Sequence, residues 1–427
     1  MTTSATPNGA AGTQQRVVMI TTSYPRFAGD TVGTFLEPIA HGIARLGHEV
    51  HVVLPWHPRL ARPAREGNVY FHPFHYAPVR SLNVFGYAAA LRADVRLRAA
   101  ALVAAPLALA SAWHAARRVA REARATLVHA HWVIPSGAVA AALPGRYPLV
   151  VSLHGSDVFV AERHAAIGAA ARAVFRRCDW VTACSDDLLL RAGRLSAPAD
   201  RSETVPYGVD ADRFRPDAEA RARWRARLDL QPDQPLVATA GRLVRKKGFE
   251  YLIDAMGQLA PRWPNAVLVV GGAGDLQEEL RARAASCGVA GRVIFTGLLK
   301  QDEVADLLAA ADVVSVPSVR DDSGNVDGLP NIVMETLASG TPLVATTAGG
   351  IGAVTHDGEN ALIVGERDVC ALADAIGALL CDKGLRQKIG QTARREVIER
   401  HSWAEVARRF EACYLAAQRH AGGRGKR

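Results

Sequence analysis

Short apolar runs alternate with helical segments in both halves of this chain, and no other feature constrains its fold as strongly. In the first half, 16–21 and 49–54 read as buried strands separated by a helix at 34–46. In the second half, the pattern restarts with a strand at 236–240 and a helix from Phe249. Strands that alternate with helices are typical of βαβ units and a parallel sheet. The sequence therefore predicts an α/β protein whose ligands bind beyond the carboxyl ends of its strands.

Length and composition fit a globular protein of two or three domains, because 427 residues at 49% hydrophobic can bury a large core. The first fifteen residues are polar and contain no apolar run, so we expect 1–15 to be a disordered tail rather than a signal peptide. The six cysteines show no C-x2-C pair and lie in or beside apolar runs: Cys178, Cys184, Cys287, Cys370, Cys381 and Cys413. This pattern favours reduced thiols in a cytosolic protein over disulfides or zinc.

The net charge of +9 is carried by residues 1–205, since 206–427 contain equal numbers of basic and acidic residues. A nucleic-acid-binding protein can show such an imbalance. However, the sequence contains no helix-turn-helix, zinc finger or interleaving of aromatic and basic residues. We therefore expect no nucleic-acid partner.

Two carboxylates, Asp327 and Glu335, flank the expected start of a helix at Pro330. Proline suits the first helical position because its φ is fixed and its missing N–H is not needed there. The free N–H groups of Asn331 and Ile332 and the positive end of the helix dipole would favour a phosphate. The sequence therefore predicts a phosphate site with a carboxylate on either side.

This D-x7-E pattern, with Gly328-Leu329-Pro330-Asn331 directly after the aspartate, resembles the E-x7-E motif of the retaining glycosyltransferases of family 4. The resemblance implies that Glu335 holds the ribose hydroxyls of a nucleotide-sugar and that Asp327 contacts hydroxyls of the donor sugar. It also places Leu329 in the donor site and the Asn331 and Ile332 amides on the diphosphate. Aspartate is one methylene shorter than the family's glutamate, which puts the identity of the sugar in question more than the reaction.

A second motif, His154-Gly155-Ser156-Asp157, follows an expected strand at 149–153. Family 4 enzymes carry H-G-[ST]-D at this point, which implies that His154 lies against the donor sugar near the reacting carbon. Asp157 would support the loop or the acceptor. The alternative for His154 is a histidine that caps the strand end and bonds to backbone.

Gly33 lies at the first strand-to-helix turn, where a missing side chain lets the backbone approach a ligand. The resemblance implies that its amide touches the donor phosphate; a helix cap is the alternative. Arg242 and Lys247 follow the strand at 236–240 and fit the family's R-x4-K pair, which neutralises the donor diphosphate. Two cations suit this chemistry because the leaving nucleoside diphosphate gains charge as the glycosidic bond breaks. Arg245 and Lys246 are placed to share this work.

We expect neither a metal nor another cofactor. Asp210-x-Asp212 resembles the inter-domain segment of the family rather than a metal site, because no strand leads into it. Gly272-Ala273-Gly274 makes a poor nicotinamide fingerprint, because Gln277 occupies the third glycine position.

The resemblance covers about 16–419 and implies two doubly wound, Rossmann-like α/β domains that face each other across a cleft, the GT-B arrangement. The predicted parts are an acceptor-side domain at 16–205, joined by a terminal helix at 403–420, a linker at 206–235 and a nucleotide-sugar-binding domain at 236–402. The implied activity is a hexosyltransferase that moves a sugar from a UDP- or GDP-sugar to an acceptor hydroxyl with retention, in glycolipid or cell-surface polysaccharide assembly. A nucleotide-sugar epimerase, a phosphorylase and a non-catalytic nucleotide-sugar-binding protein remain as alternatives.

The segment 80–124 carries eight arginines around the uncharged stretch 99–113, which Pro106 is expected to break. This stretch is too short to span a bilayer. Its length suits a helix in the membrane interface, with arginines reaching anionic phosphates and Trp113 at the boundary. That interpretation predicts a peripheral protein at the inner membrane face with a lipid-linked sugar or glycolipid acceptor. The alternative is a buried helix with solvated arginines.

Overall fold

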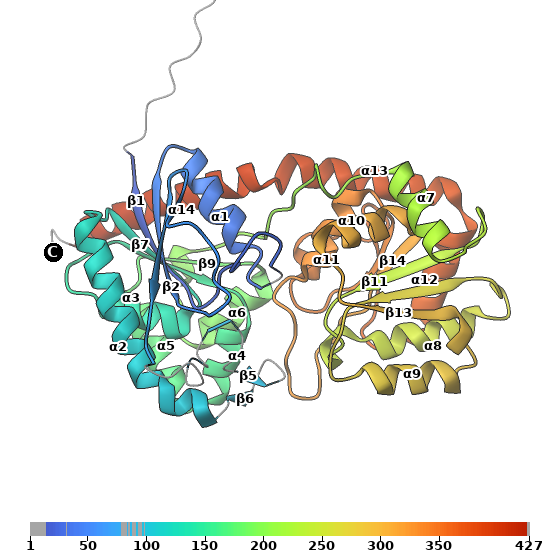
Figure 1. Cartoon of the computed structure of the whole chain (residues 1–427), viewed down its shortest axis with the longest axis horizontal. Helices are drawn as coiled ribbons and strands as arrows, with labels where there is room; N and C mark the ends of the chain where they lie inside the picture. Colours follow the sequence, from blue (N-terminus) through green and yellow to red (C-terminus); the bar gives the residue numbers. More distant parts are fainter. Residues whose placement is uncertain are drawn as a thin grey trace, which may run out of the picture.

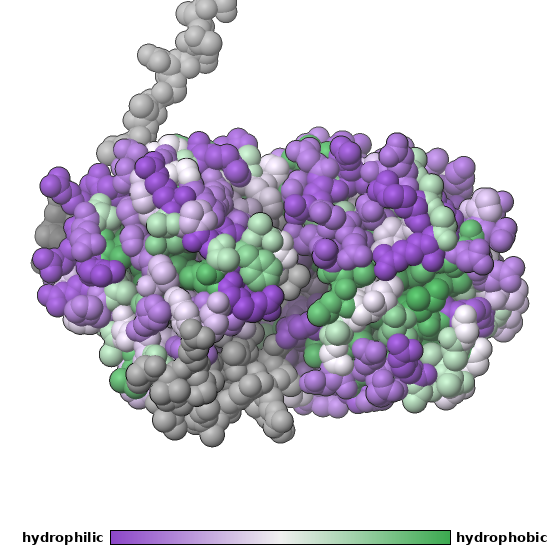
Figure 2. All heavy atoms as spheres, in the orientation of Figure 1, coloured by the Kyte–Doolittle hydropathy of each residue, from purple (hydrophilic) through white to green (hydrophobic). Residues whose placement is uncertain are grey.

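A computed structural model of the chain describes residues 14–30, 32–77, 83, 86–87, 91–92, 96–97 and 99–424. Two α/β lobes lie side by side, and the helices α13 (Lys383–Arg400) and α14 (Trp403–Arg424) run along one side of both (Figure 1). In Figure 2 a furrow separates the two lobes on the face shown. The fold class is therefore the one expected: two doubly wound domains in the GT-B arrangement.

The first lobe is built on an eight-stranded sheet in the order β10-β9-β8-β7-β1-β2-β4-β3. All neighbouring strands are parallel except β3 and β4. The strands are β1 (Arg16–Ile20), β2 (Glu49–Pro55), β3 (Arg65–Glu66), β4 (Val69–Phe74), β7 (Leu127–His131), β8 (Leu149–Leu153), β9 (Trp180–Ala183) and β10 (Ser202–Thr204). Strand order reverses at β1, so the carboxyl ends of β1 and β7 border a crevice.

Helices cover both faces of this sheet, which explains why β1 is apolar and buried from Val17 to Ile20. Val17 and Met19 pack in the cluster with α1 and α14, whereas Val18 and Ile20 pack in the cluster that includes α2. The helix α14 lies close to α1, because a Cβ built on Gly42 would be 2.9 Å from Ala407 Cβ. The helices are α1 (Leu36–Arg45), α2 (Ala99–Glu122), α3 (Ala138–Ala141), α4 (Ser156–Arg163), α5 (Ala165–Arg177) and α6 (Asp186–Arg194).

The second lobe contains six parallel strands in the order β13-β12-β11-β14-β15-β16. The strands are β11 (Leu236–Ala240), β12 (Val267–Gly271), β13 (Val293–Gly297), β14 (Val313–Val316), β15 (Leu343–Thr346) and β16 (Leu362–Val364). The helices are α7 (Ala218–Arg227), α8 (Phe249–Leu259), α9 (Gln277–Ser286), α10 (Gln301–Ala310), α11 (Asn331–Ser339) and α12 (Val369–Cys381). Strand order reverses between β11 and β14, so the loops after these two strands border the expected ligand crevice.

The expected break at Pro106 is wrong. The helix α2 is 24 residues long and continues without interruption through Pro106. Pro106 is exposed, while Ala108, Ala112 and Ala116 on the opposite face are buried in the first lobe. Burial of that face offsets the roughly 3 kcal/mol that an interior proline costs a helix. Trp113 donates its indole N–H to the Ala142 carbonyl oxygen at 2.9 Å, so it docks on the lobe itself.

This packing favours the buried-helix alternative for α2 from Ala104 onward. Arg117, Arg118 and Arg121 are exposed on its outer face, and the rest of the arginine-rich segment lies largely outside the described residues. Among the described residues, no helix combines the length and apolarity needed to cross a membrane.

Candidate functional site

A buried ion-pair cluster lies where the loops after β11 and β14 meet. Lys246 Nζ lies 2.9 Å from one carboxylate oxygen of Asp327, and Lys247 Nζ lies 2.6 Å from the other. Both lysines belong to a 3-10 turn, η4 (Arg245–Lys247), that directly precedes α8. Burial alone would raise the pKa of Asp327, but the two ammonium groups hold that pKa well below its usual range. Asp327 is therefore ionised, and the motif spacing gave no indication of this pairing.

Glu335 lies on α11, one face of which lines a cavity of about 670 Å³ between the lobes. Burial raises the pKa of Glu335 to about 7, although Lys247 and Arg213 act in the opposite direction. Near neutral pH this carboxyl group is therefore partly protonated. It can accept or donate hydrogen bonds, as binding to paired hydroxyl groups requires.

The helix α11 begins at Asn331 rather than at Pro330, which corrects the expected start by one residue. Pro330 is the N-cap and has an extended ψ of 125°. It provides no side-chain cap, so the first N–H groups of α11 are available to a ligand. Ile332 and Leu329 are buried in the core, so only their backbone groups can face a ligand.

The first lobe approaches this helix start through the turn after β1. Asn331 Nδ2 donates to Thr34 Oγ1 at 3.4 Å, which joins the two walls of the cleft. Gly33, next to Thr34, has a φ of +66°, a conformation that favours glycine. The structure therefore places Gly33 opposite α11, as the predicted donor site requires.

Glycine also lets the loop after β14 lie against the loop after β8. A Cβ built on Gly328 would be 2.9 Å from the His154 carbonyl oxygen and 2.7 Å from Cys184 Sγ. A Cβ built on Gly350, after β15, would be 1.8 Å from the Gly328 carbonyl oxygen. These contacts leave no room for larger residues and bring Asp327 beside the His154 loop.

His154 bonds to two side chains rather than to backbone, in contrast to the strand-cap alternative. Its Nε2 lies 3.0 Å from His131 Nδ1, and its Nδ1 lies 2.8 Å from the Tyr207 hydroxyl oxygen. Phe35 packs against the His154 ring, with 4.6 Å between the centroids. Burial lowers the pKa of His154 to about 3, so the imidazole is neutral. Motif spacing alone did not indicate His131 or Tyr207.

Asp157 is buried and holds the His154 loop. One carboxylate oxygen accepts from the Val133 N–H at 2.7 Å, and the other accepts from the Gly155 N–H at 3.1 Å. Burial raises the pKa of Asp157, although backbone donors such as the Val133 N–H oppose the effect. Of the two roles considered, this geometry supports the loop rather than a direct acceptor contact.

Arg242 is exposed on the turn after β11. The glycine turn after β12 packs against that turn, because a Cβ built on Gly272 would be 1.9 Å from the Gly241 carbonyl oxygen. Gly272 therefore serves close backbone packing between the two turns.

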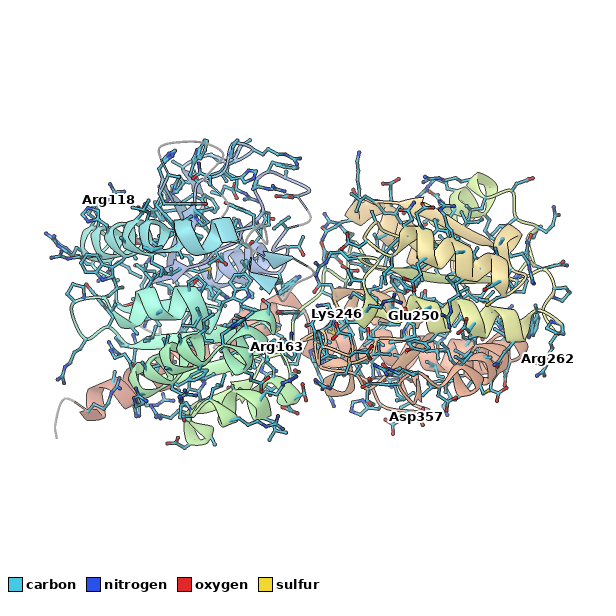
Figure 3. All side chains as sticks on the ribbon, turned by 90° about the horizontal axis from the view of Figure 1, so that it is seen from below. Arg118, Arg163, Lys246, Glu250, Arg262 and Asp357 are labelled. Atoms are coloured by element: carbon cyan, nitrogen blue, oxygen red, sulfur yellow. The ribbon has the colours of Figure 1, made fainter. Side chains whose placement is uncertain are left out.

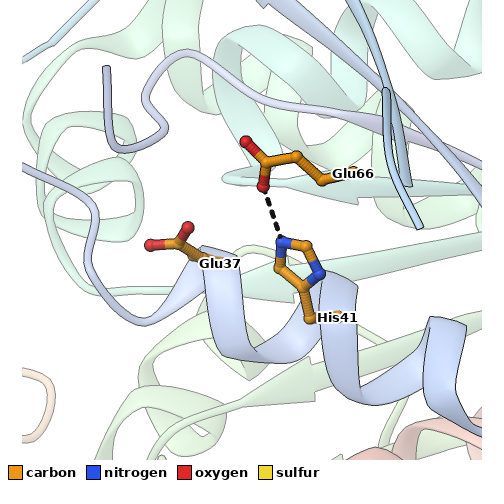
Figure 4. A group of neighbouring side chains, drawn as sticks. All are labelled: Glu37, His41 and Glu66. Atoms are coloured by element: carbon orange, nitrogen blue, oxygen red, sulfur yellow. Dashed lines mark hydrogen bonds and ion pairs between the residues drawn. The ribbon is translucent and has the colours of Figure 1, made fainter. Parts of the chain in front are cut away.

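The folded chain also brings together acidic and histidine side chains that are distant in sequence. Glu37 and His41 on α1 meet Glu66 of β3, and His41 Nε2 lies 3.1 Å from a Glu66 carboxylate oxygen (Figure 4). Arg62 forms ion pairs with both glutamates. A second group on the other lobe contains His356, Glu359 and Glu396. Asp210, in contrast, accepts from the Asp212 N–H and so stabilises its own turn.

Comparisons with known proteins show which family the chain resembles. A family model described as Glycosyltransferase Family 4 matches residues 32–213, and one described as Glycosyl transferases group 1 matches residues 220–396. A GDP-mannose-dependent alpha-(1-6)-phosphatidylinositol monomannoside mannosyltransferase of Mycobacterium tuberculosis is 35% identical over 272 residues, which is 62% of this chain and 69% of that protein. A Bacillus subtilis glycosyltransferase with a proposed role in teichuronic acid biosynthesis is 31% identical over 84% of this chain and 88% of its own length.

Solved structures share the fold. Sucrose-phosphate synthase from Thermosynechococcus elongatus matches with a TM-score of 0.75 and 21% identity over 94% of this chain and 98% of that chain. HepE of Anabaena in complex with UDP matches with a TM-score of 0.72 and 19% identity over 93% and 98%. The fold and the relatives together define a glycosyltransferase of the GT-B type. The chain belongs to glycosyltransferase family 4.

Proposed function

We propose that this enzyme transfers a sugar from a nucleotide-sugar to an acceptor hydroxyl with retention of anomeric configuration. The observation that carries the proposal is the convergence of Lys247, Asp327 and Glu335 at the uncapped start of α11. A helix start and fixed cations suit a diphosphate. Carboxyl groups on either side suit ribose and sugar hydroxyls.

The proposed reaction relies on electrostatics rather than on a protein nucleophile. The diphosphate would lie on the Asn331 and Ile332 amides, near Lys247 and Arg242, and Glu335 would hold the ribose. These cationic and N–H groups stabilise the charge that develops on the leaving diphosphate, without reorganisation. Asp327 is held by two ammonium groups and is therefore a poor nucleophile. We propose that the leaving phosphate itself accepts the acceptor's proton on the same face of the sugar, which gives retention.

The relatives guide the proposal for the substrates. The mycobacterial relative is named as GDP-mannose-dependent and as acting on a phosphatidylinositol monomannoside, and HepE was solved in complex with UDP. We propose a GDP- or UDP-sugar donor and an acceptor on a glycolipid, a lipid-linked sugar or a cell-surface polysaccharide.

A donor panel tests the proposed activity. UDP- and GDP-sugars should be screened by thermal shift, because a ligand that binds only the native state raises its stability in proportion to occupancy. The best donor should then release free nucleoside diphosphate when a hydroxyl acceptor is added. Stabilisation without release, for every acceptor tested, would indicate a non-catalytic binding protein.

We also propose reversible association with an anionic membrane, supported by the exposed arginines Arg117, Arg118 and Arg121 on α2. Each basic residue near such a surface contributes about 1 kcal/mol. In liposome flotation, the protein should float with anionic vesicles at low salt and detach in about half-molar salt, where charges are strongly screened. Protein that stays at the bottom with anionic vesicles would favour a soluble acceptor.

A further inference from the structure

Asp327 has two lysine partners, and they differ in their surroundings. Lys246 is 7% exposed, and its carbonyl oxygen accepts from the Val319 N–H at 2.9 Å, which ties its backbone to the loop after β14. Lys247 is less buried and also acts electrostatically on Glu335. Figure 3 shows Lys246 at the edge of the second lobe that faces the first. One lysine is thus fixed beside Asp327, and the other acts on both carboxylates of the site.

Donor binding would change the charge balance of this cluster. Under the proposed function, on which this inference rests, Lys247 is the lysine that engages the diphosphate. A diphosphate competes for Lys247 with the single negative charge of Asp327. Asp327 would then be a largely buried carboxylate that depends on its remaining partner, and an uncompensated buried charge is strongly destabilising.

We propose that Lys246 is a positioning residue that keeps Asp327 ionised and fixed beside the donor sugar when Lys247 engages the diphosphate. An ionised carboxylate accepts hydrogen bonds from sugar hydroxyls with both oxygens, whereas a protonated one loses part of this capacity. The fixed ammonium also holds the short aspartate side chain in one place. Lys246 therefore acts on the sugar through Asp327 and does not bind the diphosphate.

Other titratable groups act on Asp327 and must be separated from Lys246 in the test. The groups coupled to Asp327 are the Lys247 ammonium on the same turn, and the Cys184 thiol and Tyr207 phenol from the first lobe. Burial raises the pKa of Cys184 to about 12 and that of Tyr207 well above its usual value. Both are neutral below pH 9. Glu335 titrates near 7 and is coupled to Lys247, so it contributes to the pH profile of every variant that retains it.

The test compares Lys246→Met with Lys246→Arg, using Lys383→Met at the exposed start of α13 as the matched control. In Lys246→Met, the turnover number should fall at least about tenfold at pH 6 and recover partly as pH rises, because Asp327 now protonates in the working range. Lys246→Arg should restore the wild-type profile. The affinity for free nucleoside diphosphate should change less than about threefold. Loss of a direct ammonium-to-phosphate contact would lower this affinity by a larger factor.

An Asp327→Asn background separates Lys246 from Glu335. Adding Lys246→Met to Asp327→Asn should leave the pH profile unchanged, because the group that Lys246 controls is gone. The proposal is overturned if Lys246→Met has a wild-type pH profile. It is equally overturned if nucleoside diphosphate affinity falls by the same factor as turnover, which would make Lys246 a diphosphate ligand.

A carboxyl ¹³C NMR titration of Asp327 separates this inference from the proposed activity. In the protein saturated with nucleoside diphosphate, the Asp327 signal, assigned by its loss in Asp327→Asn, should titrate at higher pH in Lys246→Met than in wild type. This readout needs no turnover. If wild type transfers no sugar but the shift is seen, the proposed activity fails and the role of Lys246 stands; an absent shift overturns that role.

Discussion

The two walls of the cleft bury polar groups in opposite states. The wall on the first lobe, around His154, is neutral, and the wall on the second lobe, around Asp327, is charged. On the first lobe, His154 bonds to His131 and Tyr207, and burial lowers its pKa so that no charge is present. On the second lobe, Asp327 is equally enclosed but is ionised between Lys246 and Lys247. The comparison indicates a division of labour. Charge is concentrated where a diphosphate would leave, and a neutral, aromatic surface faces the place where a sugar would lie.

The largest expected effect comes from the charged wall. Lys247→Ala should lower turnover at least about a hundredfold, the usual scale for losing one preorganised electrostatic contact. Glu335→Gln should cause a loss of the same order. Initial rates with the best donor measure this, and Lys383→Ala provides the control. Near-native rates would show that the substituted residue does not take part in catalysis.

The neutral wall should make stability sensitive to acid. Burial lowers the pKa of His129 and His154 to about 3 and that of His131 well below its usual value. A group whose folded-state pKa is depressed stabilises the fold above its unfolded pKa, near 6.5, and loses this contribution as pH falls toward the folded pKa. His129 and His154 together should cost about 3 kcal/mol between pH 6.5 and 5, and His131 adds to this loss in the same direction.

Urea unfolding of the whole protein at pH 6.5 and at pH 5 measures this loss in the free energy of unfolding. His129→Gln should reduce the change in the free energy of unfolding between the two pH values. His356→Gln, on the surface of the second lobe, should leave this change as it is in wild type. If the free energy of unfolding changed equally with pH in wild type and both variants, the buried histidines would not be the cause of the loss of stability in acid.

Glu335 should respond to pH in the opposite sense. Its folded pKa is raised to about 7, so its contribution is fully present below its unfolded pKa of about 4.5 and is lost as pH rises through 7. Relative to wild type, Glu335→Gln should therefore gain up to about 3 kcal/mol between pH 5 and 8. Melting temperatures of both donor-free proteins at the two pH values test this. A constant difference between them would contradict the raised pKa.

A chelator should have the smallest effect. The cations of the charged wall are lysine and arginine side chains, so activity should survive EDTA unchanged. Rates before and after treatment, with added Mg²⁺ or Mn²⁺ as the control, test this. Complete loss that one metal restores would point to a metal site, and Glu37, His41 and Glu66 would be the first candidates.

The strands and the motif positions could be predicted from sequence because they depend on local patterns. The runs 149–153 and 236–240 were predicted with the bounds of β8 and β11. The start of α11 was wrong by one residue, because the extended ψ of Pro330 is set by the loop it closes. The helix α2 was misjudged at Pro106, because packing against the lobe outweighs local propensity.

The pairings within the site could not be predicted, because they depend on how distant loops meet. Lys246 and Asp327 are far apart in sequence, and a basic turn gives no indication of which carboxylate it will contact. His154 and Tyr207 meet because the segment that leads toward the second lobe returns past β8. The glycines in the sequence were an indication that two loops lie close together. Gly328 directly follows Asp327, and its missing side chain lets the two loops touch.

NMR of the reaction is the decisive measurement for the proposed sugar transfer with retention at this cleft. Wild type is incubated with the donor chosen by thermal shift and with a hydroxyl acceptor, and the anomeric proton signals and the free nucleoside diphosphate are followed together. We expect a product with the donor's anomeric configuration and one nucleoside diphosphate released per sugar transferred. An inverted product, an epimerised donor without release, or a reaction that requires inorganic phosphate would contradict it.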